Sequence, residues 1–504
     1  MDNTTGSEMI IAQLNKNVET LINKILWFKD ELIGLPDSSV TEKNSFGREE
    51  RLLRKGFVKL SVKTIPDDCL ENIKRLESLE KALHQTTKEL ADTIAGIKLQ
   101  QHLDSDFNKE AEKELAKSQK GRMKNIGSRI VNIRMMGGTI IAVLVTYYHR
   151  KATLKKYKGL RGFYPGLMLV GITHRYSPGL ESLSSLLATA TCSFAEASQL
   201  MQETLGFKMD VKTIRSIAKR FAEMARKSIE LDKVKKPSDF VGRIIAASTD
   251  GGRIRIRKNK RGKKTQKGRT RYRTDWREPK LIIIYVVGQD GQKDRKVLPI
   301  MDATLNGPDE TFALLVYYLR KLDVNSSDFL LFVSDGAKWI WERAKNLAES
   351  VGICITRCLF ALDYYHAVEH LSALALAAQL DKKQKDKWVN RQKERLLNGN
   401  LETFMDEITL ICKDSKNELV KREHAYFKKH LPNMKYAELR ARGLPIGSGA
   451  VESGIRRVVN LRLKGPGIFW HEDSADAMLM LRSYYKAGRW DMLKTMSHTG
   501  LLAA

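Results

Sequence analysis

The chain has 504 residues, in which 88 Lys and Arg residues outweigh 59 Asp and Glu residues to give a formal net charge of +29. Hydrophobic residues make up 42 % of the chain, which excludes a disordered protein, and the length allows roughly two to four domains. So large a positive excess favours a polyanionic partner, with nucleic acid ahead of an anionic membrane surface.

The cysteine content and the apolar segments indicate the compartment. Five scattered cysteines, an odd number, argue against a disulfide framework and for a reducing environment. Cys354 and Cys358 are four positions apart but no second pair follows, so a zinc site there is not expected. The N-terminus lacks the pattern of a signal peptide, and the most apolar stretch, 139–145, is too short to cross a bilayer. We therefore expect a cytoplasmic protein with no membrane partner.

The first part of the chain, residues 1–125, is predicted to be helical. Helices are expected over 8–33 and 69–100, and the second carries apolar residues at steps of mostly three and four. This stripe can pack within its own domain, or it can pair with a second copy as a dimerisation coiled coil. Its members are Leu70, Ile73, Leu76, Leu79, Leu83, Leu90, Ile94 and Ile97.

Residues 126–236 are expected to form a DNA-binding region. The stretch 109–165 is basic and mixed, and its pattern assigns no elements. Further on, a helix begins near Ser193, a turn follows at Gly206, and a basic helix begins near Asp210. This arrangement over about 193–227 suits a helix-turn-helix, although many helical hairpins share it.

From residue 240 the pattern changes to strands alternating with helices. Strands are predicted for the segments that end at Asp250, for 253–257, 281–287 and 329–333, and for 353–360, with helices over 308–320 and 337–349. This alternation predicts an α/β domain with a mixed sheet, formed by 240–363 and 441–490. The Lys- and Glu-rich stretch 364–440 is predicted to be a helical insertion.

Three carboxylates stand out, because a basic protein places them beside small residues at the ends of apolar segments. Asp250 ends "IIAASTD", Asp335 ends "FLLFVSD", and Glu452 lies in "PIGSGAVESGIRR". Acids packed together repel each other unless a positive charge neutralises them, and Mg²⁺ prefers carboxylate oxygens. Two such ions, about 4 Å apart, can hold the attacking and leaving oxygens of a phosphodiester. Taken singly, an Asp at a strand end is also a common turn former.

The segments "STDGGR", "VSDGAKWIW", "LDYYHAVEHL" and "PIGSGAVESGIRRVVNLRLKGPGIFW" resemble DDE transposases of bacterial insertion sequences, closest to the ISKra-like group, which is related to the Mutator-like transposases. The resemblance covers about 175–490. It implies a ribonuclease-H-like core in which Asp250, Asp335 and Glu452 are catalytic and bind two Mg²⁺ or Mn²⁺ ions. Asp363 and His366 match a D-x-x-H element, which is expected to lie just behind the metal ligands.

The resemblance also implies a reaction and a setting. Water cuts a phosphodiester at the element's terminal repeat, and the same site then joins the exposed 3′-OH to target DNA. The partners implied are double-stranded DNA, both terminal repeats and target, and a second copy of the chain, in a bacterial, nucleoid-associated location. Many relatives carry a Cys-rich zinc motif before the helix-turn-helix, whereas residues 130–175 contain no cysteine.

DNA contacts are expected mainly from the basic segment that follows Asp250. Its side chains can hold phosphates without reading sequence, although a solvated basic loop is the simpler interpretation. Arg456, one turn beyond Glu452, can steady that carboxylate or touch phosphate, and Trp470 can stack on an extruded base or belong to the core. The predicted DNA-binding residues are Arg253, Arg255, Arg257, Lys258, Lys260, Arg261, Lys263, Lys264, Arg456, Arg457 and Trp470.

Two other functions fit part of the sequence. His366-x-x-Glu369-His370 is the inverted zinc-peptidase pattern, but a peptidase explains neither the charge nor the basic segment. A transposase-derived protein that binds DNA without catalysis is the second alternative, and the presence of all three acids argues against it.

Overall fold

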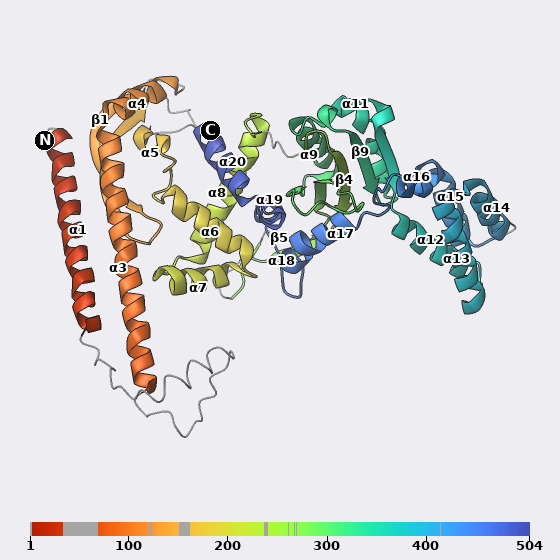
Figure 1. Cartoon of the computed structure of the whole chain (residues 1–504). Helices are drawn as coiled ribbons and strands as arrows, with labels where there is room; N and C mark the ends of the chain where they lie inside the picture. The colour runs from red at the N-terminus through yellow and green to blue at the C-terminus, as the bar shows by residue number, and fades with distance from the viewer. Residues whose placement is uncertain are drawn as a thin grey trace, which may run out of the picture. The chain divides into compact units, whose positions relative to one another are not determined.

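The computed structural model describes residues 3–33, 69–119, 123–150, 162–235, 240–260, 262–266, 268, 270–413 and 415–503. The chain divides into two compact units: unit 1 comprises 1–184 and 198–210, and unit 2 comprises 185–197 and 211–504. Figure 1 shows the elements along the chain. None of the helices in the described ranges is both long and apolar enough to cross a membrane.

Unit 1 combines helices with a small antiparallel sheet that the sequence did not predict. In the sheet, β2 lies between β1 and β3, and Gly138 turns the β1–β2 hairpin with a φ of 101°. Gly has this conformation at no steric cost. Polar and charged residues interrupt the pattern of β1, whereas β2 includes most of the apolar stretch 139–145. The elements are α1 (Asn3–Ile33), α3 (Cys69–Asp104), α4 (Asp106–Ser118), β1 (Met123–Arg134), β2 (Ile140–Arg150), β3 (Gly162–Phe163) and α5 (Pro165–Leu169).

Helix α3, which carries the predicted stripe, is joined to the sheet of its own unit. The Asp92 carboxylate accepts hydrogen bonds from the amides of Gly137 and Thr139, both at 3.0 Å. The Gln100 side chain binds both the amide and the carbonyl of Leu144. The C-terminal half of the helix therefore packs on its own unit, although Ile94 of the predicted stripe is exposed there. Ile73 and Leu76, in its N-terminal half, are exposed, and pairing with a second copy stays a prediction.

The predicted helix pair is present as α7 (Phe194–Leu205) and α8 (Val211–Glu230), which follow α6 (Pro178–Ala190). Gly206, at the turn, has a φ of 78°. The boundary between the two units runs through α6 and α7 and again between Asp210 and Val211. Along α8 a continuous apolar face is buried, from Ile214 to Ala225, as expected for a helix that packs on a core.

Unit 2 contains a five-stranded mixed sheet in the order β10-β9-β4-β7-β8. β4 is parallel to β9, and β9 is parallel to β10, whereas β7 is antiparallel to both of its neighbours. The strands are β4 (Ile244–Gly251), β7 (Lys280–Val286), β8 (Ile300–Thr304), β9 (Phe329–Ser334) and β10 (Cys358–Leu362), and a separate hairpin is formed by β5 (Ile254–Asn259) and β6 (Tyr272–Arg277). The predicted mixed α/β class is thus confirmed, and β6 and β8 are additions to the predicted strands.

Helices cover both faces of this sheet. Successive residues of a strand point to opposite faces, so Leu281 and Phe332 mark different sides. Phe312 of α9 packs on Phe332, with ring centroids 6.3 Å apart. On the other face, a Cβ at Gly454 of α17 would lie 2.5 Å from the Leu281 side chain, so only glycine permits this close approach. These two helices are α9 (Gly307–Lys321) and α17 (Gly449–Ile455).

The predicted insertion is helical and shares one apolar core with the sheet face that α17 covers. Its helices are α12 (Tyr364–Ala377), α13 (Lys382–Asn398), α14 (Leu401–Cys412), α15 (Glu418–His430) and α16 (Tyr436–Ala441). After α17 the chain makes a π-helical turn, η5 (Arg456–Asn460), then α18 (Leu461–Leu463), α19 (Glu472–Ala487) and α20 (Trp490–Ala503). Between β9 and β10 lie α10 (Lys338–Ala344) and α11 (Leu347–Val351).

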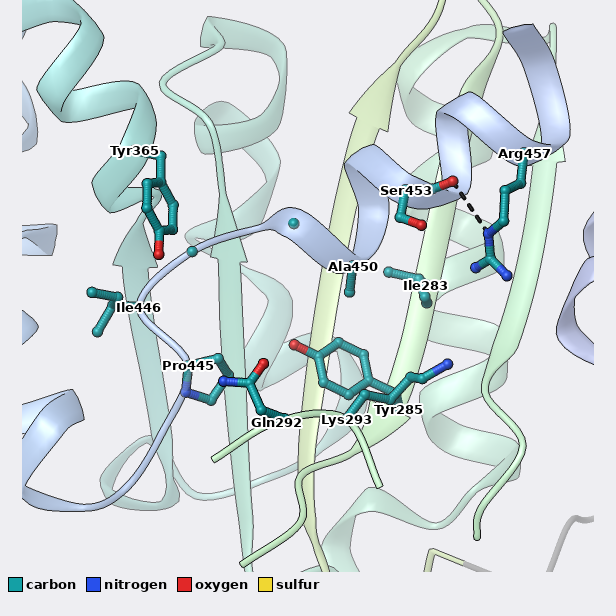
Figure 2. A pocket seen from close by; sticks show the side chains of 12 residues that line it. Ile283, Tyr285, Gln292, Lys293, Tyr365, Pro445, Ile446, Ala450, Ser453 and Arg457 are labelled. Carbon is teal, nitrogen blue, oxygen red and sulfur yellow. Dashed lines mark hydrogen bonds between the residues drawn. The ribbon is translucent and has the colours of Figure 1, made fainter. Parts of the chain in front are cut away.

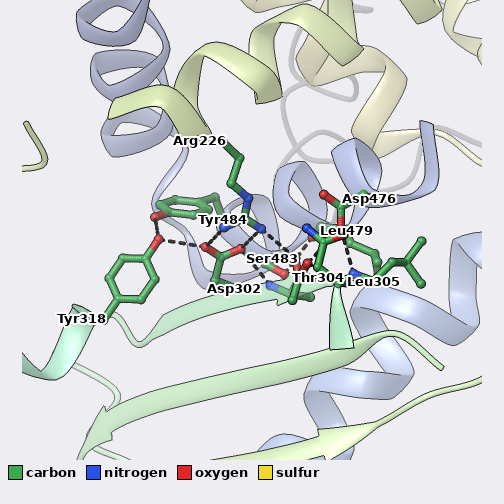
Figure 3. A network of polar contacts seen from close by, with 11 residues as sticks. Arg226, Asp302, Thr304, Leu305, Tyr318, Asp476, Leu479, Ser483 and Tyr484 are labelled. Atoms are coloured by element: carbon green, nitrogen blue, oxygen red, sulfur yellow. Dashed lines mark hydrogen bonds and ion pairs between the residues drawn. The ribbon is translucent and has the colours of Figure 1, made fainter. Parts of the chain in front are cut away.

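A buried polar network ties α8 to the sheet (Figure 3). Arg226 donates two hydrogen bonds to the Asp302 carboxylate in β8, at 2.6 and 2.8 Å. The Tyr318 hydroxyl donates to the same carboxylate at 2.8 Å and also meets the Tyr484 hydroxyl at 2.6 Å. Burial alone would lower the pKa of Arg226, but the charge and hydrogen bond of Asp302, together with Tyr318 and Asp476, raise it overall. Arg226 therefore serves the fold and is not available to DNA.

Candidate active site

Three aspartates lie at one edge of the sheet because three neighbouring parallel strands end there. β4 pairs with β9 through Ala247 and Phe332, and continuing that register places Asp335 beside Asp250. β9 pairs with β10 through Ser334 and Leu362, so Asp363 follows as the next neighbour. Neighbouring strands are about 4.8 Å apart, and residues in register share a face. All three carboxylates thus project from the face that α17 covers.

Asp363 organises the end of this row and connects it to Glu452. As the N-cap of α12, its Oδ1 accepts hydrogen bonds from the amides of Tyr365 and His366, at 2.6 and 3.3 Å. Its Oδ2 accepts from the Ser448 amide at 2.7 Å and from the Ser448 hydroxyl. Ser448 immediately precedes α17, and its Oγ lies 3.4 Å from Glu452 Oε1. The buried Asp363 therefore fixes both helices that carry the remaining polar groups of the site.

His366 and Glu452 complete a group that could hold a metal ion. The Nε2 atom of His366 lies 3.8 Å from Glu452 Oε1. Each of Asp363, His366 and Glu452 offers a ligand atom, and these atoms lie within 4.8 Å of one another. Among the described residues, these three form the group of His, Cys, Asp or Glu side chains that is spaced closely enough to hold a metal ion. From the sequence, Asp363 and His366 were expected to lie just behind the metal ligands and not to bind the metal themselves.

The electrostatics of the site show that Asp250 lies within reach of the other acids. Burial raises the pKa of Asp250 to about 6, against an ordinary value of 3.8, and the charges of Asp335 and Glu452 add to the rise. Burial likewise raises the pKa of Asp335, and the nearby Asp363 contributes. His366 opposes both shifts. Such a cluster favours either protons or a cation.

The carboxylates of Asp250 and Asp335 are held by their own backbone turns. The amide of Gly251 donates to Asp250 Oδ1 at 2.6 Å, and the amide of Ala337 donates to Asp335 Oδ1 at 3.0 Å. One lone pair on each Oδ1 is occupied in this way, and no other hydrogen bond from the described residues reaches either carboxylate. The remaining oxygen of each carboxylate is free for a cation.

The insertion reaches the site through Tyr426 of α15. A Cβ at Gly336 would lie 2.3 Å from the Tyr426 ring, so the glycine after Asp335 makes room for this side chain. The Tyr426 hydroxyl is buried without a hydrogen-bond partner among the described residues. The sequence indicated that small residues beside the acids allow close approach, but it gave no signal that a tyrosine from 90 residues downstream uses the space.

The two histidines of the inverted zinc-peptidase pattern face different partners. His366 belongs to the acid cluster, whereas His370 Nδ1 lies 2.5 Å from Glu423 Oε2. The His370 ring also stacks on Tyr426, with centroids 3.7 Å apart. His370 therefore does not join His366 in a common set of ligands, and the structure gives the peptidase alternative no support.

The basic segment after Asp250 forms the β5–β6 hairpin, whose arginines lie over aromatic rings. Arg253 lies 4.7 Å from the centroid of Trp276, and Arg257 lies 4.3 Å from that of Tyr272. Arg255 donates to the Gly465 carbonyl at 2.6 Å, and Lys258 pairs with Asp275 at 3.0 Å. A cation held over an exposed ring keeps its outer side available to phosphate.

The other predicted DNA-binding residues differ in accessibility. Lys260, Lys263, Lys264 and Arg456 are exposed, while Arg261 lies outside the described residues. Arg457 is half-buried and its Nε donates to the Ser453 carbonyl at 3.3 Å. The exposed side chains can meet a DNA backbone without rearrangement of the fold.

Trp470 and Trp276 differ in exposure, and the sequence had assigned a role only to Trp470. Trp470 is only 6 % exposed, packs edge-on against Phe194, and exchanges backbone hydrogen bonds with Arg255 and Arg257 of β5. These contacts favour the alternative in which Trp470 belongs to the core. Trp276 is 49 % exposed and lines a cavity of about 440 Å³ that begins at Gly251, directly after Asp250.

Comparison of the chain with protein-family models and with curated proteins found no match. The function must therefore be inferred from the residues and their geometry.

Proposed function

We propose that the chain is a DDE-type DNA transposase, which cleaves phosphodiester bonds at the ends of an insertion sequence and joins the 3′-OH to target DNA. The observation that carries the proposal is the convergence of Asp250, Asp335 and Glu452, remote in sequence, on one edge and one face of a sheet in a strongly basic chain. Phosphoryl transfer needs positioned oxygen ligands and positive groups that can neutralise phosphate, and the acid cluster with the nearby Arg253 offers groups of both kinds.

The arrangement of the sheet supports the finer assignment of a ribonuclease-H-like core. If the five strands are numbered by their order in the chain, their order across the sheet is third, second, first, fourth, fifth. The second strand is antiparallel to both of its neighbours. Asp250 lies on the first strand, and Asp335 follows the fourth. Glu452 comes after the helical insertion, where the resemblance places the third acid.

The donor set fits divalent cations that prefer oxygen. Asp250, Asp335 and Glu452 would hold two Mg²⁺ or Mn²⁺ ions, with His366 beside Glu452. When bound, such ions stabilise the phosphate charge and make water a stronger nucleophile. The chain itself positions Glu452 through the Asp363–Ser448 bonds and keeps Asp335 in place through the turn to Ala337. Glu452, with a side chain that is 49 % exposed, leaves the site open to a large substrate.

The exposed part of the β5–β6 hairpin supports DNA as that substrate. Arg253 and Trp276 border the cavity beside Asp250, where an arginine suits a phosphate and an exposed indole suits an unpaired base. Binding of this kind depends steeply on salt. The dimeric state, the terminal-repeat and target DNA, and the bacterial nucleoid location belong to the same proposal.

The test is metal-dependent nicking of DNA that carries the element's own ends. Asp335→Asn should keep DNA binding at the wild-type level and abolish nicking, because it removes one metal ligand without changing the basic surface. Asp328→Asn, an exposed carboxylate at the opposite end of β9, is the matched control and should nick normally. Unchanged nicking by Asp335→Asn would refute the assignment. DNA binding without nicking by the wild type would favour the catalytically inactive alternative.

A further inference from the structure

A second cavity in unit 2, of about 390 Å³, lies over the sheet next to α17 (Figure 2), and its lining residue Tyr365 adjoins the acid cluster through Asp363. Its lining includes two cations, Lys293 and Arg457, and the side chains of Tyr285, Tyr365 and Ser453. None of the described residues that line it is a carboxylate. A concave surface with cations, hydroxyl groups and no acid is suited to an anion.

The Tyr285 hydroxyl is the most informative group in this cavity. Tyr285 is only 4 % exposed and lines the cavity. Burial raises the pKa of Tyr285 to about 12, so the phenol keeps its proton at neutral pH and can donate it. Figure 2 shows the oxygen directed into the cavity. A hydroxyl that faces the cavity can donate a hydrogen bond to a ligand there.

The two cations point to the same kind of ligand. Lys293 is half-buried, without a carboxylate partner in the described part of the chain, and both burial and the nearby charges of Arg457 and Arg295 lower its pKa. Two positive charges close together in a partly desolvated cavity repel each other, and an anion bound between them relieves this repulsion. Arg457 offers the planar donor pair that suits phosphate.

We infer that this cavity binds a phosphate ester, held by Lys293 and Arg457 at one end, with the Tyr285 hydroxyl available to the same ligand from the other. Two sources share that chemistry, the DNA backbone and a free nucleotide. DNA as the source rests on the proposed function, because Tyr285 lies four residues along β7 from Leu281, the partner of Asp250. At ~3.3 Å per residue, Tyr285 lies about 13 Å along the strand from Leu281, which corresponds to roughly four base steps of duplex. α17 carries Glu452 on one side and Ser453 on the other, so a bound phosphate would also steady the catalytic helix.

The first experiment maps Lys293 directly. An amine-reactive reagent labels the protein in the Asp335→Asn background, and mass spectrometry measures modification of Lys293 with a 30-base-pair duplex, with AMP or with inorganic phosphate present. Protection by the duplex supports a backbone phosphate as the ligand. Protection by AMP alone supports a phosphate-ester site and overturns DNA as its source. No protection by any of the three overturns the inference. The readout does not require nicking, so a failure of the proposed function would leave it interpretable.

The second experiment measures how DNA affinity depends on salt. Each phosphate contact contributes about 0.9 to the slope of log affinity against log salt, so Lys293→Ala with Arg457→Ala should reduce the slope by about one to two. Lys383→Ala with Lys387→Ala removes the same charge from an exposed face of α13 and should leave the slope unchanged. Lys293→Arg retains the charge and should restore the wild-type slope. Equal slopes for the two double variants would contradict a DNA phosphate in the cavity.

Discussion

Replacement of Asp250 by asparagine should stabilise the metal-free protein at neutral pH. The folded chain raises the pKa of this carboxyl from 3.8 to about 6, chiefly through burial and then through Asp335 and Glu452. A group that binds its proton more tightly when folded makes stability fall as pH rises through the interval between the two values. At about 1.4 kcal/mol per pH unit, the loss above pH 6 approaches about 3 kcal/mol, which is an upper limit because the group is partly solvated.

The asparagine side chain cannot ionise, so Asp250→Asn should escape this loss. Urea unfolding followed by tryptophan fluorescence is a suitable assay, because six of the seven tryptophans lie in unit 2. Without metal, the variant should exceed the wild type by about 2–3 kcal/mol at pH 8 and by close to nothing at pH 4. Asp328→Asn, which removes a carboxylate away from the cluster, should show no such pH-dependent gain.

Magnesium should make the wild type more stable than Asp250→Asn. Mg²⁺ that binds the folded wild type adds to its stability in proportion to the logarithm of its concentration, whereas Asp250→Asn has lost a charged ligand and should gain less. If Asp250→Asn is no more stable than the wild type at pH 8 without metal, the clustering of acids described above is wrong. If magnesium stabilises both proteins equally, Asp250 is not a metal ligand.

Two further substitutions test the assignments around the site. Trp276→Ala should lower DNA affinity on the order of tenfold, by loss of one stacking surface, with little change in the urea midpoint; Trp470→Ala should instead cost about 3–5 kcal/mol of stability, as for a core residue. Equal effects of the two on DNA affinity would contradict their separation. Arg226→Met should cost about 3–5 kcal/mol in urea unfolding because it leaves the buried Asp302 unpaired, and adding Asp302→Leu should recover part of that loss. A cost below about 1 kcal/mol would show that the network in Figure 3 contributes little.

The strands of unit 2 and their terminal acids were predictable because their signal is local. An apolar run that ends in Asp, as at 329–335, fixes the strand and the acid together. The strands β1, β6 and β8 were missed because charged residues interrupt their patterns, and β2 was missed although it includes most of the apolar stretch 139–145. Arg226 belongs to a helix that the sequence showed only to be basic, and the packing against β8 showed that it pairs with the buried Asp302.

The sequence by itself determined the basic character, the mixed α/β class, and the candidates Asp250, Asp335 and Glu452, because each depends on composition or on a short pattern. Only the tertiary structure decided that Asp363 continues the row of acids, that Tyr426 approaches Asp335, and that the exposed indole is Trp276. These relations depend on strand register and helix packing between segments far apart in the chain, and no local pattern of residues encodes which of those segments will meet.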